Sequence, residues 1–313
     1  MLTNASDLND VTSVILSKMS LKALTAAVLN AGGNWAIRFP SIEILRLNVV
    51  LKGECWLSVD GEKNKHHLQA GDCFLQPLGK SFTLSKDLSV KNKIYYAEKL
   101  VINAKNGVIT CGCGGDILVG GSAFQFEGHF PKIIFGRLPA VIHIPANLDQ
   151  AAVLRWSLER FAAELQNKNA GRSLMLNQLA TIMLLQTLRV YTGFSKDENN
   201  WVTALADPKL YLAIEAMHSN YKKNWTVDEL ASLVGVSRAG FALSFKKRIG
   251  LAPMEYFKNW RMQIACELLE TGKLSITEIA NAVGYDSESA FSVAFKRIVK
   301  CRPGAYQKNM GSR

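Results

Sequence analysis

One pattern occurs twice near the C-terminus of this chain, and it is the feature that most constrains the fold. The stretch WTVDELASLVGVSRAGFALSFKKRIG (residues 225–250) reappears in altered form as LSITEIANAVGYDSESAFSVAFKRIVK (residues 274–300). The two copies align when Gly235 is placed on Gly284. Each copy predicts a helix, a turn at the glycine and a second helix.

The residue types fit two helices that cross steeply through a short turn. Such a crossing needs a small residue at the contact, which Ala231 and Ala280 supply, and a glycine in the turn tolerates positive φ at no cost. Ser237 is a suitable N-cap for the second helix of the first copy. Phenylalanines four residues apart are expected to bury one face of each second helix: Phe241 with Phe245, and Phe291 with Phe295.

The opposite face of each second helix carries small and polar residues and ends in basic ones. A helix of this kind can enter the major groove of DNA. The residues expected to face the bases are Ser237, Arg238, Ala239, Ala242 and Leu243 in the first copy, and Glu288, Ser289, Ser292 and Val293 in the second. The residues expected to contact phosphates are Lys246, Lys247, Lys296 and Arg297.

Charge distinguishes this interpretation from two ordinary helical hairpins with solvated basic residues. The chain carries a net charge of +11. From Pro208 onward there are 16 Lys and Arg against 9 Asp and Glu, whereas the first 207 residues hold 21 against 17. The positive charge therefore concentrates where the pattern is duplicated, which favours a polyanionic partner. Two reading helices one helical turn apart, roughly 34–36 Å, would reach successive major-groove faces.

Residues from about 207 to 307 resemble the DNA-binding domain of AraC/XylS-type transcription regulators. The resemblance rests on WTVDELA, SRAGFALSFKK, APMEYFKNWRMQIACELL, EIANAVGYDSESAFSVAFKR and RPGAY, which occur in the order of that domain. It implies two helix-turn-helix units joined by a long helix, with base readers at the positions named above. Two positions depart from the family pattern, because Lys300 stands where many members have Gly and Gln307 where many have Arg.

The N-terminal part of the chain has a different pattern of apolar and turn-forming residues. Short apolar runs separated by Gly, Asp and Asn extend from about residue 35 to 143 and predict consecutive strands, hence a sandwich or barrel. This segment resembles the cupin-type effector domain of one branch of the same family, mainly through LQAGDCFLQPLGKSF. We therefore expect an α+β protein of two domains, with a cupin-like β-barrel or jelly roll (residues 1–194), a linker (195–207) and an all-α double helix-turn-helix domain (208–313).

Helical periodicity is expected before and after the strands. Residues 13–30 predict a helix, and residues 149–194 predict two helices around a break at Gly171. The second of these two is apolar on more than one face. Its apolar faces must be buried either against its own domain or against a second subunit, and we favour a homodimer.

The cupin-like segment lacks the histidines of a metal site. Phe82 stands at one position where metal-binding cupins have a histidine, and Asn48 stands at another. Neither residue replaces an imidazole ligand, so we expect no metal and no other cofactor. A cupin-type metalloenzyme remains the alternative in which this domain is catalytic.

Cysteines offer two interpretations of the segment ITCGCGGD. Cys111 and Cys113 alternate on an expected strand and would face the same side, as a pair of oxidant-sensing thiols would. The other interpretation is that a buried cysteine packs as a small apolar residue. The remaining cysteines are scattered, which suits a reducing cytoplasm.

These observations converge on a cytoplasmic, sequence-specific DNA-binding transcription regulator that is not an enzyme. Its expected partners are double-stranded DNA, RNA polymerase, a second copy of the chain, and a small molecule or oxidant sensed in the cupin-like domain. A sequence-indifferent architectural DNA binder is the other alternative. No apolar run is long enough for a membrane span, and Asp7 and Asp10 stand where a secretory signal would be basic.

Overall fold

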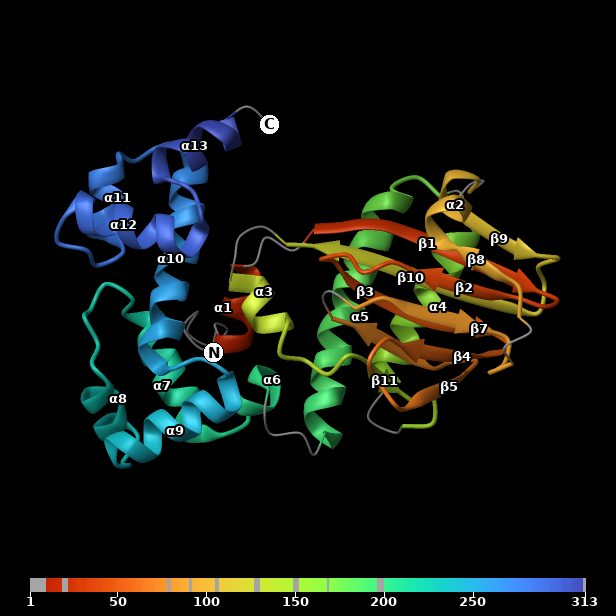
Figure 1. Ribbon diagram of the computed structural model, residues 1–313, viewed down its shortest axis with the longest axis horizontal. Coiled ribbons are helices and arrows are strands. Elements are labelled where there is room, and N and C mark those ends of the chain that lie inside the picture. Colours follow the sequence, from red (N-terminus) through yellow and green to blue (C-terminus); the bar gives the residue numbers. More distant parts are fainter. Residues whose placement is uncertain are drawn as a thin grey trace, which may run out of the picture. The chain divides into compact units, whose positions relative to one another are not determined.

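The computed structural model describes residues 10–18, 22–77, 80–89, 92–104, 107–126, 130–148, 152–167, 169–195 and 200–311. The chain divides into two compact units. The barrel unit comprises residues 22–125 and 138–195, and the helical unit comprises residues 1–21, 126–137 and 196–313. Figure 1 labels the elements of both units.

Two β-sheets build the barrel unit (Figure 1). The strands are β1 (Lys22–Gly32), β2 (Ala36–Phe39), β3 (Leu45–Lys52), β4 (Glu54–Val59), β5 (Lys65–Gln69), β6 (Cys73–Gln76), β7 (Phe82–Ser85), β8 (Ile94–Tyr96), β9 (Val108–Gly112), β10 (Ile117–Gln125) and β11 (Ile142–Ile144). One sheet has the order β11-β6-β3-β10-β1-β9 and the other the order β5-β4-β7-β2-β8. The strand-rich, cupin-like fold expected for this part of the chain is confirmed.

The core of the barrel unit lies between its two sheets. Leu29 and Val119 of the first sheet belong to one buried cluster with Leu57 and Leu84 of the second. The period-two alternation of β3 produces its two faces, because Leu45, Leu47 and Val49 are buried while the residues between them point the other way.

Helices cover the first sheet. The helices α4 (Ala152–Gln166) and α5 (Arg172–Phe194) pack against each other and against β1. Gly171, at the break expected between them, has a left-handed φ of 75° that favours glycine. A third helix of this unit, α2 (Ala97–Ile102), follows β8.

The helix expected over residues 13–30 is wrong in its second half. The helix α1 (Val11–Ser17) is short, and Lys22–Gly32 is the strand β1. This strand lies inside its sheet, antiparallel to β10 on one side and parallel to β9 on the other. A strand whose sheet is covered on both faces tends to be apolar on both, and β1 is packed by the core between the sheets and by α4 and α5. Periodicity alone therefore does not separate it from a helix.

The helical unit contains the duplicated pattern. Its elements are α1, α3 (Phe130–Phe135), α6 (Trp201–Ala204), α7 (Pro208–Ser219), α8 (Val227–Leu233), α9 (Arg238–Ile249), α10 (Pro253–Thr271), α11 (Ile276–Ala282), α12 (Glu288–Val299) and α13 (Pro303–Gly311). The long helix α10 has α8 and α9 near one end and α11 and α12 near the other (Figure 1). Two helix-turn-helix pairs joined by a long helix were expected, and the structure has them.

Two segments from outside the C-terminal hundred residues belong to the helical unit. The Lys18 side chain, just after α1, lies 2.7 Å from Glu267 of α10, and Gln263 of the same helix donates to the Lys18 carbonyl. Phe130 of α3 meets Trp260 of α10 with ring centroids 5.5 Å apart. The division drawn from the sequence placed both segments in the front domain and treated residues 195–207, which contain α6, as a linker.

No helix in the described part of the chain combines the length and the apolar character that crossing a membrane requires.

Candidate nucleic-acid interface and barrel cavity

Both helix-turn-helix pairs begin with the same cap. Thr226 caps α8 and Ser275 caps α11, each accepting a hydrogen bond from the backbone of a glutamate three residues later. The carboxylate of that glutamate, Glu229 or Glu278, in turn accepts from the backbone of the capping residue. These reciprocal hydrogen bonds satisfy two otherwise unpaired donors and fix where each first helix starts.

The two turns also share one geometry. Gly235 and Gly284 have φ of 66° and 79°, and the residue after each glycine donates to the carbonyl of the alanine expected at the helix crossing. Ala231 and Ala280 are themselves buried. The duplicated pattern in the sequence therefore corresponds to a duplicated structure, down to individual hydrogen bonds.

The second helix of each pair is capped and anchored as expected. Ser237 accepts a hydrogen bond from Gly240 at the start of α9, and Ser287 accepts one from Ala290 at the start of α12. The inner faces are formed by buried phenylalanines, with centroid distances of 5.7 Å for Phe241 and Phe245 and 5.5 Å for Phe291 and Phe295.

The residues expected to face DNA lie on the solvent side of these two helices. In α9, Leu243 is 73% exposed, and in α12 Val293 is 69% exposed. Such exposure of two large apolar side chains at equivalent positions indicates a surface that contacts another molecule. The other expected base-facing residues are exposed or half-buried: Ser237, Arg238, Ala239, Ala242, Glu288, Ser289 and Ser292.

The two polar residues that begin the reading helices contact the preceding helix of their own pair. Arg238 Nη1 lies 3.1 Å from Asp228 Oδ2, and Thr277 Oγ1 donates to Glu288 Oε2 at 2.5 Å. Asp228 and Thr277 occupy the same place in the two copies of the pattern, as Arg238 and Glu288 do. Each contact fixes the orientation of the polar side chain that begins the second helix of its pair.

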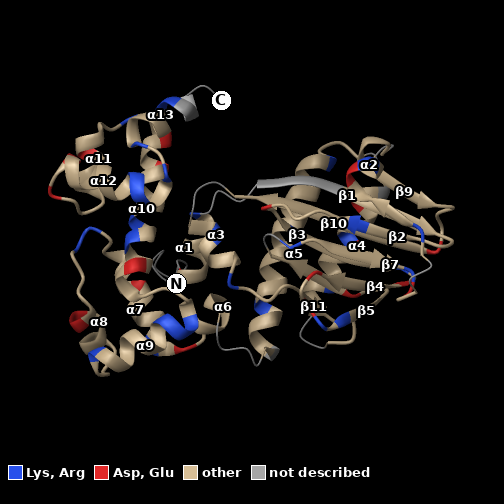
Figure 2. Cartoon of the chain, in the orientation of Figure 1, with Lys and Arg blue, Asp and Glu red and all other residues tan. Residues whose placement is uncertain are grey.

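The four cations expected to contact phosphates are also exposed. Lys246 and Lys247 lie in the last turns of α9, and Lys296 and Arg297 lie in the corresponding part of α12. Figure 2 marks the Lys and Arg residues of these helices and of α10. Cations at this end of a helix also interact favourably with its carbonyl groups.

Arg261 of α10 links the two pairs, and the sequence reasoning missed it. Its guanidinium donates to the carbonyls of Tyr221, Lys222 and Lys223 in the loop before α8. It also reaches the carbonyl of Gly284 in the turn of the second pair, at 3.4 Å. Burial lowers the pKa of this guanidinium. The signal in the sequence was an arginine in the middle of a long helix, with no other charged residue in the stretch NWRMQIA around it, where a buried cation needs partners.

Gly284 has no room for a side chain because Arg261 occupies that space. A Cβ there would lie 2.5 Å from Arg261 Nη2 and 2.5 Å from the Lys222 carbonyl oxygen. Gly235, at the equivalent place in the first pair, has open space around it. The second turn is therefore fixed against α10 by a contact that the first turn lacks.

The barrel unit contains a cavity of about 500 Å³. Strands of both sheets line it together with α2. Small residues on neighbouring strands leave the space, among them Ala27, Gly121 and Ala123. The lining is largely apolar, and Arg46, Asn48 and Glu98 are among its few polar members.

The histidine positions of metal-binding cupins hold Phe82 and Asn48, as noted above. Phe82 is buried and stacks on Phe39 with ring centroids 4.4 Å apart. Within the described ranges, no group of three or more His, Cys, Asp or Glu side chains is placed to hold a metal ion. His143 instead contacts Asp72, with 2.9 Å between Nε2 and Oδ2.

Cys111 and Cys113 do not share one side of a strand, so that expectation is wrong. The strand β9 ends at Gly112, whose φ of 63° turns the chain. Cys111 is buried in the core, whereas Cys113 is exposed. Burial raises the pKa of the Cys111 thiol to about 11, which disfavours the reactive thiolate.

Comparison with known proteins agrees with this architecture. The family model described as a cupin matches residues 10–193, and one described as a helix-turn-helix domain matches residues 230–309. An AraC-like transcription regulator of Streptomyces antibioticus is 36% identical over 94% of this chain and 97% of its own length. One from Streptomyces lividans is 34% identical over 94% and 97%. The transcriptional regulator AlkR of Acinetobacter baylyi is 29% identical over 96% and 99%.

Proposed function

The chain belongs to the family of AraC-like DNA-binding transcription regulators, and on that premise we propose that α9 and α12 read DNA in two successive major-groove faces. The observation that carries the proposal is the pair of reading helices, each capped, anchored by phenylalanines and exposed on its other face. Arg261 holds the two pairs in a fixed relationship, as a site with fixed half-site spacing requires.

Direct readout is modest. Arg238 is suited to a guanine edge, Glu288 accepts from a cytosine amino group, and Ser289 and Ser292 bond several bases. Ser237, Ala239, Ala242, Leu243 and Val293 supply surface and contacts to thymine methyl groups. DNA shape then contributes a substantial share of the specificity. Lys246, Lys247, Lys296 and Arg297 contact phosphates and set the affinity for all sequences.

The signal enters the barrel unit as a small molecule in its cavity. The apolar lining and the volume of about 500 Å³ match the sites that take small organic ligands. Oxidation is the alternative signal, and the exposed thiol of Cys113 is the feature that favours it. The buried Cys111, with its raised pKa, lacks the accessible thiolate that sensing needs.

The signal reaches the reading helices through α1 and α3. In the chain, α1 directly precedes β1 and α3 directly follows β10, and both strands contribute to the cavity lining. Both helices belong to the helical unit and contact its central elements, through Lys18 on Glu267 and Phe130 on Trp260. A ligand that favours one arrangement of β1 and β10 changes the free energy of these contacts and thereby of DNA binding.

The regulator acts as a homodimer in the cytoplasm and communicates with RNA polymerase. Support for the dimer comes from exposed apolar side chains on α4 and α5. Trp156 is 55% exposed and Leu174 65% exposed, and Val153, Met175 and Ile182 are exposed as well. Exposed apolar side chains on two packed helices suit a second copy of the same surface.

A site-selection experiment tests the DNA-binding proposal. Full-length protein selects from random duplex DNA, and its affinity for the selected site is compared with that for a scrambled duplex at several salt concentrations. We expect a ratio of specific to non-specific affinity of roughly 10³ or more. A ratio near one at every salt concentration would instead identify a sequence-indifferent architectural binder.

A further inference from the structure

Two polar side chains of β3 line the cavity side by side. Arg46 and Asn48 are two residues apart, so they lie on the same face of the strand. The neighbouring strand β10 places Ala123 opposite Arg46 and Gly121 opposite Asn48. The two polar side chains therefore have an alanine and a glycine as their cross-strand neighbours, and the Asn48 amide uses the room that Gly121 leaves.

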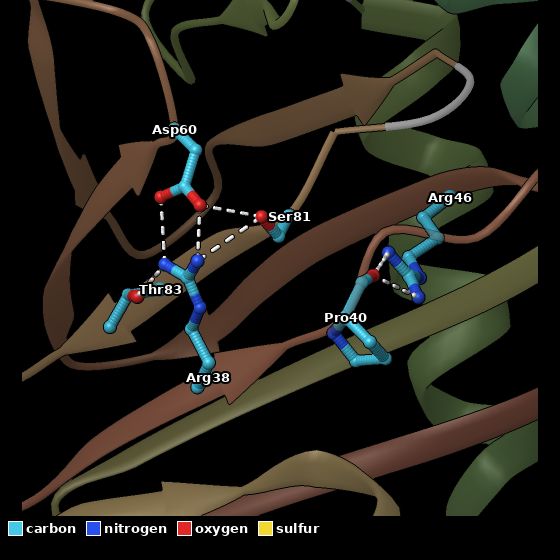
Figure 3. Close-up of polar contacts among 6 residues, drawn as sticks. All are labelled: Arg38, Pro40, Arg46, Asp60, Ser81 and Thr83. Carbon is cyan, nitrogen blue, oxygen red and sulfur yellow. Dashed lines mark hydrogen bonds and ion pairs between the residues drawn. The ribbon is translucent and has the colours of Figure 1, made fainter.

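Arg46 differs sharply from a second arginine of the same barrel (Figure 3). Arg38 on β2 forms a two-pronged ion pair with Asp60, and Ser81 and Thr83 add further hydrogen bonds. Arg46 has only the carbonyl oxygen of Pro40, which lies 3.4 Å from both Nη1 and Nη2. Within the described residues, no carboxylate forms an ion pair with Arg46.

The surroundings of Arg46 are apolar. Its guanidinium carbon lies 5.2 Å from the centroid of the Phe82 ring and 5.9 Å from that of Phe39. Ring faces attract a cation, but they leave the N–H groups without acceptors. Burial lowers the pKa of this guanidinium to about 10, and an arginine stays charged at neutral pH even so. The cavity therefore contains a positive charge whose five donors are nearly unused.

Asn48 adds a second unused donor. Its Nδ2 atom is buried and has no hydrogen-bond partner among the described residues. Its amide fills the space beside Gly121, where a Cβ would lie 2.4 Å from Oδ1. A buried polar group without a partner costs free energy, and such groups are rare unless a ligand or water completes them. Glu98, the acidic residue of the lining, is exposed, and in the part of the chain that the structure describes it forms no ion pair with Arg46 and no hydrogen bond with Asn48.

We propose that this cavity binds a small carboxylate with an apolar body, and that Arg46 grips the carboxylate while the Asn48 amide donates a further hydrogen bond to it. A planar guanidinium matches a carboxylate with two parallel hydrogen bonds, which Pro40 with its single oxygen does not supply. The apolar lining takes the rest of the molecule. This inference rests on the proposed function, because it names the chemical class of the signal that the barrel unit senses.

Calorimetric titration of the full chain tests the site with two probe pairs. Decanoate is compared with decan-1-ol, and 2-naphthoate with 2-naphthalenemethanol, so that each pair shares an apolar body and differs in charge. We expect at least one carboxylate to bind about tenfold to a hundredfold more tightly than its alcohol. Equal binding of carboxylate and alcohol in both pairs, or no binding of either carboxylate, would overturn the proposal.

Three variants locate the binding. Arg46→Met is expected to abolish the preference for the carboxylate while leaving alcohol binding intact. Arg38→Met removes a matched arginine of the same unit, which already has its own carboxylate, and should leave the preference unchanged. Ala123→Leu fills the cavity opposite Arg46 and should weaken both members of a pair. Carboxylate preference that survives in Arg46→Met would place the site elsewhere.

The selected DNA site separates this inference from the proposed function. A carboxylate that binds at Arg46 should change the affinity for that site at least severalfold in the wild type and not in Arg46→Met. Carboxylate binding without any such change would overturn its role as the signal. Protein that selects no specific DNA would overturn the proposed function, whatever the titrations show.

Discussion

Arg238 Nη1 of α9 lies 3.1 Å from the carboxylate oxygen Oδ2 of Asp228, which stands in the first turn of α8. Both side chains are more than half exposed, so the pair contributes at most about 1 kcal/mol to stability. Its importance is orientation, because it directs the guanidinium that we propose to read a base from the start of α9. Glu288 and Thr277 repeat the arrangement in the second pair.

Arg238→Ala should relax specificity at one position of the DNA site. A guanidinium bonded to a guanine edge contributes roughly 1–3 kcal/mol of discrimination, whereas alanine offers no donor. Competition binding against all four bases at each position measures the change. Ser232→Ala alters an exposed residue of α8 outside the proposed reading surface and serves as the control. An unchanged preference at every position in Arg238→Ala would remove this residue from the reading surface.

Lys246→Ala should weaken binding to all DNA sequences alike. A phosphate contact releases about one counterion, so the slope of log affinity against log salt should fall by about one. Measuring that slope on both the selected and a scrambled duplex checks the prediction. Loss of affinity on the selected duplex alone would mean that Lys246 contacts a base.

The sequence predicted the helices α9 and α12 well, because the residues that determine them are close together in the chain. Caps, turn glycines and phenylalanine spacing lie within one copy of the pattern, and each has a fixed place in it. Arg261 was missed because its partners, Tyr221, Lys222 and Lys223, lie about forty residues away and are backbone carbonyls, which leave no trace in residue type. For the barrel unit the sequence predicted an apolar interior, but it did not predict which residues line the cavity.

The strand β1 and the placement of α1 and α3 could not be predicted for a related reason. Leu29 and Ala31 of β1 belong to the core between the sheets, while α4 and α5 pack against the same strand, and that environment exists only in the assembled unit. The apolar residues of α1 and α3, such as Val11 and Phe130, show that these segments need cover. They do not show that α1 packs against α7 and α3 against α10.

Arg261→Met should loosen the spacing requirement of the DNA site. The substitution removes the donors that join the loop before α8 to the turn at Gly284. Duplexes with one base pair inserted or deleted between half-sites measure the effect. Wild-type protein should discriminate strongly among these spacings, and the variant should discriminate severalfold less.

A general loss of stability does not produce that pattern, since it would lower affinity for all spacings together. Lys258→Met removes an exposed cation from the same helix and is the matched control. Retained spacing discrimination in Arg261→Met would show that packing alone positions the two pairs.

Lys300→Gly should stabilise the helical unit. Lys300 ends α12 with a φ of 69°, the left-handed conformation that costs a residue with a Cβ roughly 1 kcal/mol. The first copy has Gly250 at this place, with a φ of 85°. Chemical denaturation should therefore show an increase of about 1 kcal/mol in the free energy of unfolding.

Gly250→Ala is the reverse test. An alanine is strained at its φ of 85°, and the Arg137 side chain must also move from the new Cβ, so the free energy of unfolding should fall by about 1 kcal/mol or more. A Lys300→Gly variant no more stable than the wild type would mean that the lysine side chain makes a compensating contact.

His218 should make the stability of the helical unit depend on pH. Burial lowers the pKa of its imidazole to about 3, and the ring stacks on Trp260 with centroids 3.7 Å apart. Because the folded pKa lies below the ordinary value of about 6.5, the stabilising contribution is fully present above pH 6.5. It is lost as pH falls toward 3, since only the unfolded state takes up the proton. Between pH 7.5 and 5 the loss is about 2 kcal/mol.

His218→Phe isolates this contribution from the titration of other groups. Phenylalanine retains an aromatic ring against Trp260 but has no proton to take up, and it gives up the contact to the Tyr256 hydroxyl. Urea unfolding at pH 7.5 and pH 5, followed by tryptophan fluorescence, gives the change in free energy for each protein. The wild type should lose about 2 kcal/mol more than the variant over this interval. Equal losses would mean that the imidazole accepts a proton in the folded state, and therefore that the helical unit opens around His218 more readily than its packing indicates.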